Sequence, residues 1–427
     1  MSVEQAEYFV PPECLCIGLY IHVGLPWTCH PFGMNSFKIK TEDQIRQLRA
    51  LNVAGFQFDP ARSDTVPPNL PVAPNARAAA GQAVFPGDAA EFESKRRRAA
   101  QIAERRTRIR KIEKALVEAG TVMRNVSRNL LARPVECLQE AGALVDEMVR
   151  AFLEQPEVSL HVLADKSGGE ELYYHGLNTS ILAMMVAREL EIGPDECRLL
   201  GLGALLHDIG LADVPDRVRL RTADMNHAER EMRKLHCEFG LRMARRIGLP
   251  APVQDIIFAH HEMADGSGYP RGLPGSQTPP LARLVALVNY YDNLCNPSEV
   301  TRALTPHEAL SFMFAQRRGK FDSRALQALI RCLGVYPPGT LVRLSNDAIA
   351  MVSSVNPHRP LRPWVLVYDA QVAKEEALMI DLDQESDINI STALRPAQLP
   401  AQIYEYLSPC RRITYFFDAD TPLGGRS

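Results

Sequence analysis

The residues with the clearest chemical potential are five of the eleven histidines, which recur with carboxylates in one stretch of the chain. The set consists of Glu171, His175, His207, Asp208, His236, His260 and His261. Mixed imidazole and carboxylate ligands suit divalent iron, manganese or zinc, and a set of this size can hold more than one ion. The residue types therefore predict a metal centre.

The spacing of these residues decides how they can converge. Glu171 and His175 are four positions apart, so a helix places both on one face. The pairs His207-Asp208 and His260-His261 fall at predicted helix ends, where neighbouring side chains point about 100° apart around the axis. Pairs from different helices can thus reach one pocket.

The isolated members of the set also have a simpler interpretation. A single Glu-x-x-x-His pattern on a helix is usually a solvated pair, and a lone histidine such as His236 is more often a surface or capping residue. His207 and Asp208 differ, because they end an apolar helix where core residues are expected. Burying them without partners is costly, and a metal ion would offset that cost.

Helices are expected to position this cluster. The hydrophobic periodicity, with Gly and Pro between the segments, predicts them at residues 135–153, 172–190, 195–208, 227–247 and 253–261. We therefore expect an all-α catalytic domain over residues 133–336.

The remaining regions have other patterns, so the expected fold class is multidomain. Residues 1–60 mix short strand-like runs with a short helix, which predicts a small α+β domain, to which we assign regulation. Residues 61–90 are a Pro/Ala-rich linker by composition. Residues 91–132 predict a basic helix, whose interspersed Glu residues favour a solvated helix over a nucleic-acid or lipid contact. Residues 337–427 predict a β-rich C-terminal segment.

Composition sets limits on partners and location. A net charge of -3 gives no global attraction to nucleic acid, so no nucleic-acid polymer is expected as a partner. The longest apolar stretch, residues 199–206, is too short to span a bilayer, and no signal-peptide pattern opens the sequence. Scattered cysteines without a CxxC pair fit a reducing cytoplasm.

Two segments resemble the motifs of a known family. LLHDIG at residues 205–210 and HHEMADGSGYPRGLPG at residues 260–275 are similar, in this order, to the two motifs of the HD-GYP family of cyclic di-GMP phosphodiesterases, which belongs to the HD superfamily. The N-terminal segment GLYIHVGLPWTCHPFGMNSFKI is similar to a small domain of unknown function that is often fused to HD-GYP domains.

The resemblance implies a function and assigns roles to positions. It implies metal-dependent hydrolysis of cyclic di-GMP to pGpG, with further cleavage to GMP left open, by two or three divalent ions, iron or manganese. The implied metal ligands are Glu171, His175, His207, Asp208, His236, His260, His261 and Asn289, with His207 and Asp208 as the catalytic pair. The implied substrate contacts are Asp265, Gly266, Gly268, Tyr269, Pro270 and Arg302. Signalling-protein partners and the oligomeric state stay open.

Two departures from the family pattern concern the motifs themselves. Leu211 stands where the family has a lysine that contacts phosphate, and the candidates to supply the lost charge are Arg217, Arg219 and Arg221. Ala264 replaces an aromatic residue.

Two further departures lie beyond the second motif. Asn289 replaces a metal-binding aspartate, so the metal it touches should bind more weakly, unless Asp292 one turn along compensates. Ser298 replaces a substrate-contacting arginine, and Arg302 is the nearest candidate to take its place.

Two alternatives to the phosphodiesterase therefore stay open. Leu211, Asn289 and Ser298 favour a catalytically degenerate domain that binds a cyclic dinucleotide or a protein and signals by conformation. The other is an HD hydrolase for another phosphorylated substrate, which the loop of residues 268–270 makes less favoured because it matches the cyclic di-GMP branch.

Overall fold

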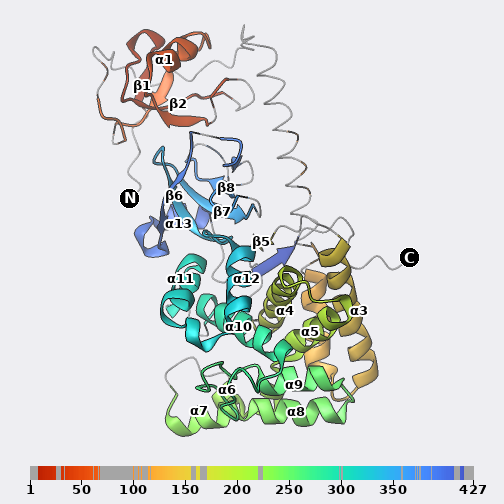
Figure 1. Ribbon diagram of the computed structural model, residues 1–427. Helices are drawn as coiled ribbons and strands as arrows, with labels where there is room; N and C mark the ends of the chain where they lie inside the picture. The colour runs from red at the N-terminus through yellow and green to blue at the C-terminus, as the bar shows by residue number, and fades with distance from the viewer. Residues whose placement is uncertain are drawn as a thin grey trace.

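The computed structural model describes residues 8–65, 117–154, 160–163, 171–219, 225–299, 302–407 and 414–417, with short gaps inside these ranges. In Figure 1 an N-terminal sheet unit lies at the top, a second sheet below it and a helical domain at the bottom. None of the described helices is long and apolar enough to cross a membrane. Most of the predicted linker, and most of the predicted basic helix before residue 117, lie outside the described residues.

The N-terminal unit is α+β, as predicted, and consists of a four-stranded antiparallel sheet with one helix. The sheet order is β1-β4-β2-β3. The elements are β1 (Tyr8–Val10), β2 (Tyr20–His22), β3 (Ser36–Lys38), α1 (Glu42–Arg49) and β4 (Phe56–Phe58). The Thr41 side chain caps α1 by accepting from the backbone N–H of Gln44. Strand β2 begins only at Tyr20, because Gly18 turns the chain with a φ of 93° just before it.

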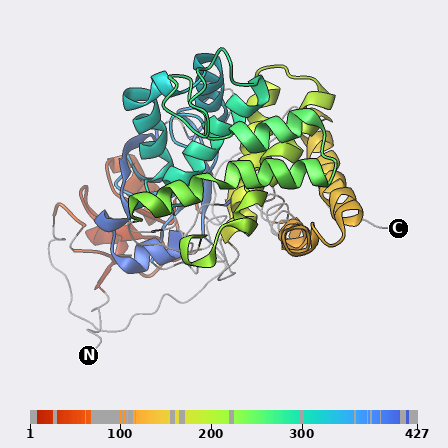
Figure 2. The same ribbon diagram turned by 90° about the horizontal axis from the view of Figure 1, so that it is seen from below.

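The helical domain follows, and most of its helices lie where the periodicity places them. Its longer helices are α3 (Pro134–Glu154), α4 (Glu171–Glu189), α5 (Pro194–Leu206), α7 (His227–Lys234), α8 (His236–Arg246), α9 (Ala251–Ala259), α10 (Pro280–Cys295), α11 (Pro306–Gln316) and α12 (Ser323–Leu333). Two short helices, η3 (Ile209–Asp213) and α6 (Asp216–Arg219), connect α5 to α7. Figure 2, seen from below, shows α7 and α8 lying across the near face.

One predicted helix is wrong in its continuity. Residues 227–247 form two helices, α7 and α8, interrupted by a turn at Leu235. The ring N–H of His236 donates to the carbonyl of Arg233 at 2.7 Å, which engages a carbonyl at the end of α7 with a side chain. The break starts α8 at His236, one of the residues predicted as metal ligands.

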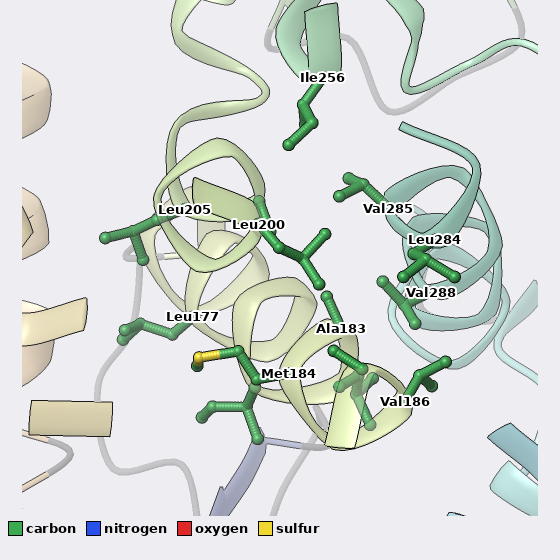
Figure 3. Close-up of a cluster of buried hydrophobic side chains, with 14 of the residues drawn as sticks. Leu177, Ala183, Met184, Val186, Leu200, Leu205, Ile256, Leu284, Val285 and Val288 are labelled. Carbon is green, nitrogen blue, oxygen red and sulfur yellow. The ribbon is translucent and has the colours of Figure 1, made fainter. Parts of the chain in front are cut away.

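The core of the helical domain is built around α4 and α5, as Figure 3 shows. Leu177 and Met184 of α4 lie beside Leu200 and Leu205 of α5, and α10 closes the other side with Val285 and its neighbours. Helix α5 is buried on nearly all sides because α3, α4, α9 and α10 all contact it. Its apolar sequence is what a central helix requires.

The C-terminal region is β-rich, as predicted. Its five-stranded antiparallel sheet has the order β10-β6-β7-β8-β9. The elements are β6 (Leu341–Leu344), β7 (Ile349–Ser354), β8 (Trp364–Val367), β9 (Met379–Asp381), β10 (Ile390–Leu394) and α13 (Ala401–Leu407). This sheet contacts the N-terminal unit: Met34 packs into its core, and the Ser36 hydroxyl donates to Asp369 at 2.8 Å.

A third, two-stranded sheet corrects the expectation of a purely helical domain over residues 133–336. Strand β5 (Leu160–Leu163), which precedes α4, pairs antiparallel with β11 (Thr414–Phe417) near the C-terminus. Strand β11 also contacts α4, and Figure 1 shows β5 at the upper end of the helical domain. A four-residue strand whose partner is so distant in sequence has no local signal that would reveal it.

Candidate metal centre

The cluster is assembled from the ends of several helices that meet at one point. Helix α5 ends at Leu206, and His207 is its C-cap. Asp208 is the N-cap of η3, which packs against α8 so closely that a Cβ on Gly210 would lie 1.9 Å from the carbonyl oxygen of His236. Only glycine permits this approach, and it brings α8 to Asp208.

The ring nitrogens of the cluster face one another in pairs. The Nε2 atoms of His175 and His207 are 3.2 Å apart, and those of His236 and His260 are 3.1 Å apart. Asp208 lies between the two pairs. Its Oδ1 is 3.3 Å from Nε2 of His236, whereas its Oδ2 is 3.5 Å from Nε2 of His207.

The opposite ring nitrogens show which form each imidazole takes. Nδ1 of His207, His236 and His260 lies 2.7, 2.7 and 2.8 Å from the backbone carbonyls of residues 204, 233 and 257, respectively. A carbonyl only accepts, so each Nδ1 carries the proton, and in the neutral ring Nε2 is left with a lone pair. Facing lone pairs repel unless a cation lies between them, so the donor set fits divalent metal ions.

The ligand atoms fall into two groups that share one residue. Asp208, His236, His260 and His261 form one group, and His175, His207 and Asp208 form the other, with all ligand atoms of a group within 4.8 Å of one another. The two groups of ligand atoms could each hold a cation, and Asp208 is the residue that they share.

Burial sets the charge state of these groups. Burial lowers the pKa of His207 to about 3, lowers that of His236, and holds that of His261 well below its ordinary value. Burial would raise the pKa of Asp208, but the surrounding imidazoles keep it well below its usual range. The cluster is therefore ionised at Asp208 and neutral at these three histidines, which is the state that binds cations.

His175 is held by an outer carboxylate. Its Nδ1 lies 2.6 Å from Oδ2 of Asp292, which is fully buried on α10 and also accepts from Asn178 and Asn296, each at 2.9 Å. Burial lowers the pKa of His175, but the hydrogen bond to Asp292 and the negative charges of Asp292 and Asp208 together raise it by more, so the net shift is upward. A carboxylate–histidine pair of this kind fixes the ring and leaves Nε2 free for a metal.

Asn289 lies beside this pair. It is buried on α10, and its side-chain oxygen accepts from Asn293 at 2.6 Å. A hydrogen bond from the ring of His175 to Asn289 also contributes to the raised pKa of His175. The sequence offered Asp292 as a replacement ligand for Asn289, but its carboxylate instead accepts from Nδ1 of His175.

The glycine-rich loop lies against the second group of ligands. The ring of Tyr269 stacks on that of His261, with centroids 4.4 Å apart and planes at 21°. A Cβ on Gly268 would lie 2.4 Å from the carbonyl oxygen of His261, so glycine is required there. Burial keeps the pKa of Tyr269 far above its ordinary value, so its hydroxyl stays protonated as a donor.

A buried glutamate holds this loop in place. The carboxylate of Glu262 accepts the backbone N–H groups of Arg271 and Leu273 at 2.7 and 2.8 Å. Asp265 has its carboxylate engaged inside the loop, where it accepts from the backbone of Ser267 at 3.0 Å and lies 3.7 Å from Lys320.

The other predicted residues have different outcomes. The side chain of Glu171 and the whole of Ser298 and Arg221 lie outside the described residues. Arg302 is exposed and pairs with Glu299 at 2.7 Å, so the structure does not bring it into the cluster.

The arginines proposed to supply the charge missing at Leu211 lie in different places. Leu211 is buried with Val214 and Val218, and Arg217 is exposed. Arg219 lines a cavity beside Asp208.

Sequence reasoning missed two supporting residues. Glu262 directly follows the histidine pair and gives no sign of its backbone contacts, because these depend on the path of the loop. Asp292 was noted only as a substitute ligand, although a carboxylate three positions from Asn289 on a helix points to nearly the same face.

Comparisons with known proteins agree with this organisation. An HD domain model matches residues 143–325, a model of a domain of unknown function (DUF3391) matches residues 9–141, and a model of a KOW domain associated with the HD domain matches residues 341–402.

Two relatives carry informative names. The cyclic di-GMP phosphodiesterase PA4108 of Pseudomonas aeruginosa is 28% identical over 91% of this chain and 92% of its own length. The cyclic di-GMP phosphodiesterase response regulator RpfG of Xanthomonas campestris is 30% identical over 49% of this chain and 55% of its own length. Among solved structures, Bd1817, an HDG"Y"P protein from Bdellovibrio bacteriovorus, shares 18% identity at a TM-score of 0.41, covering 76% of this chain and 98% of its own.

Proposed function

Because this chain is an HD-domain protein whose N-terminal region is a DUF3391 domain, we propose that it is a metal-dependent phosphodiesterase that hydrolyses cyclic di-GMP to pGpG. The relative named PA4108 supports the substrate, since it aligns over nearly the whole of both chains. The observation that carries the proposal is the position of Asp208, whose two carboxylate oxygens each face a separate group of histidine nitrogens.

The chain's own residues would hold the ions in two positions. His175, His207 and Asp208 would bind one, and Asp208 with His236, His260 and His261 would bind the other. Glu171 and Asn289 are proposed as further ligands, which would leave room for a third ion. We propose iron or manganese, because neutral imidazole with carboxylate suits these metals.

Bound divalent ions would neutralise the nonbridging oxygens of the phosphodiester and lower the pKa of the attacking water. Asp208 and His207 act through holding these ions. The Tyr269 hydroxyl, which stays protonated, is a donor to a phosphate or a guanine of the substrate, and Gly266, Gly268 and Pro270 shape the loop that presents it.

The test is metal analysis coupled to turnover on one anaerobically purified sample. We expect at least two equivalents of iron or manganese and conversion of cyclic di-GMP to pGpG, with any GMP resolved chromatographically. Asp208→Asn should abolish turnover and lower the bound metal, whereas Asp255→Asn, an exposed position on α9, should leave both unchanged. Intact cyclic di-GMP after incubation with the metal-loaded protein would refute the proposal.

The second candidate is a domain that binds a cyclic dinucleotide and signals without turnover. The observations that favour it are the uncharged Asn289 beside His175 and the burial of Leu211 in an apolar cluster. This candidate predicts saturable cyclic di-GMP binding with no product, and turnover that is lost in His260→Ala would exclude it.

A further inference from the structure

A cavity of about 350 Å³ opens beside the metal cluster, and His207 and Asp208 of that cluster are among the residues that line it. One side is formed by the helical residues 117–129 and the turn after them, and the other by the end of α5, by η3 and by α8. Residues 117–129 fall within the match to the N-terminal family model, whereas Asp208 belongs to the HD domain match. The two matched regions therefore build this cavity together.

The walls of the cavity are apolar and its polar groups are few. Met123, Val126 and Leu130 line it from one side, and Leu205 and Leu211 line it from the other. Sites for small molecules typically combine apolar walls with a few placed polar groups, over roughly 300–1,000 Å³. A volume near the lower end of that range suits one base of a dinucleotide better than the whole molecule.

Two arginines give the cavity its positive charge, beside the carboxylate of Asp208. Arg128 lines it from the N-terminal side, is exposed, and has no hydrogen-bond or ion-pair partner among the described residues. Arg219 lines it from the HD side, and its Nε is buried without a partner in the described part of the chain, although its Nη2 pairs with Asp216 at 2.5 Å. Leu131, at the rim, is 41% exposed although it is apolar.

We propose that this cavity receives one guanine-containing half of the substrate, and that Arg128 is a specificity-determining residue for the base. The proposal rests on the proposed function, because it places the base next to the phosphodiester that the metal cluster would cleave. The apolar walls cover the faces of the purine ring. A guanidinium can donate to both O6 and N7 of guanine, a pair of acceptors that adenine does not offer.

The same placement gives Leu211 a role. A lysine at this position would bring a charged amine among the apolar side chains that line the cavity, whereas leucine extends the apolar wall. The positive charge is instead carried by Arg128 and Arg219 at the edges. The N-terminal region thereby contributes a residue to substrate recognition through its last helical segment.

The experiment compares Arg128→Ala with Arg133→Ala, an exposed arginine that does not line the cavity. The first readout is calorimetric binding of GMP and AMP to the metal-loaded full chain, which needs no turnover. We expect Arg128→Ala to weaken GMP binding about ten-fold and to reduce the preference for GMP over AMP, because a bidentate arginine–guanine contact discriminates to about this degree. Arg133→Ala should bind both like the wild type.

A second variant fills the space. Ser127 is exposed and lines the cavity, so Ser127→Trp should fold normally, as checked by circular dichroism, and should block GMP. Ser127→Ala is its size control. Both Arg128→Ala and Ser127→Trp should raise the KM for cyclic di-GMP, which Arg133→Ala should leave unchanged.

The outcomes separate this proposal from the proposed function. The proposal for the cavity is refuted if the wild type does not bind GMP, or if GMP binding is unchanged in both Arg128→Ala and Ser127→Trp. This holds even if cyclic di-GMP is hydrolysed. If cyclic di-GMP stays intact while GMP binding responds to these variants as expected, the proposal for the cavity is supported and the proposed hydrolytic function is refuted.

Discussion

At the scale of single residues, Asp292 would affect metal binding indirectly. Its carboxylate contacts His175 and would not itself touch the metal. We predict that Asp292→Asn lowers metal affinity about ten- to a hundred-fold, because the ring of His175 loses its charged acceptor and its fixed orientation. Metal titration of the chelator-treated protein measures this. Asp255→Asn is the matched control on a neighbouring helix, and equal affinities in the two variants would contradict the role.

Glu262 acts on the opposite side of the cluster, through the backbone of the glycine-rich loop. In Glu262→Gln one oxygen is replaced by an NH₂ group that faces a backbone N–H, which leaves a buried donor unsatisfied at a cost of about 1–3 kcal/mol. We expect a lower kcat/KM for cyclic di-GMP and faster amide hydrogen exchange in residues 268–273. Glu238→Gln, at an exposed position on α8, should change neither quantity. Unaltered exchange in Glu262→Gln would show that the loop keeps its conformation without the contacts of Glu262.

At the scale of elements, the packing of η3 on α8 depends on Gly210. A methyl group there meets the backbone of both His236 and Gly240, so neither helix can relieve the clash by rotating a side chain. We predict that Gly210→Ala destabilises the protein by about 3 kcal/mol and lowers the thermal midpoint by roughly 5–10 °C, with loss of bound metal.

The control for this packing is Gly193→Ala. Gly193 precedes α5 with an ordinary φ of -67° and has no atom within 4 Å of the added methyl group. Its midpoint should stay close to the wild type. Similar thermal unfolding of the two variants would show that η3 and α8 adapt to the added volume.

The same elements show what the sequence can and cannot predict. The helices and the His207-Asp208 pair follow from local signals, namely periodicity, Gly/Pro punctuation and polar residues at the end of an apolar run. The break at Leu235 depends on a ring contact of His236, and the pairing of β5 with β11 joins distant segments. The position of Arg128 beside Asp208 depends on how two regions dock, which no local pattern encodes.

At the scale of the whole molecule, the N-terminal unit is fastened to the C-terminal sheet through a buried polar chain. The Ser36 hydroxyl gives its proton to Asp369, so Nδ1 of His22, 2.8 Å away, must donate to Ser36. Burial lowers the pKa of His22, although the charge of Asp369 opposes this shift. In the folded protein the ring therefore stays neutral at pH values somewhat below 6.5, its ordinary pKa.

This contact predicts a pH dependence with a definite sign. The unfolded chain takes up a proton at His22 near pH 6.5, whereas the folded chain does so only at lower pH, so stability falls as the pH drops below about 6.5. His22→Gln should reduce the difference between the thermal midpoints at pH 7.5 and pH 5.5. His227→Gln, at an exposed histidine, is the control, and an equal pH effect in the wild type and His22→Gln would contradict the prediction.

The pairing of β5 with β11 has a consequence for how the protein is made. Synthesis runs from the N-terminus, so β5 leaves the ribosome long before β11, and the whole helical domain and the five-stranded sheet are translated in between. During that interval the strand that leads into α4, the helix that carries His175, has no partner edge. A nascent chain therefore exposes an unpaired strand next to an unfinished metal centre, and premature termination before residue 414 would leave it in that state.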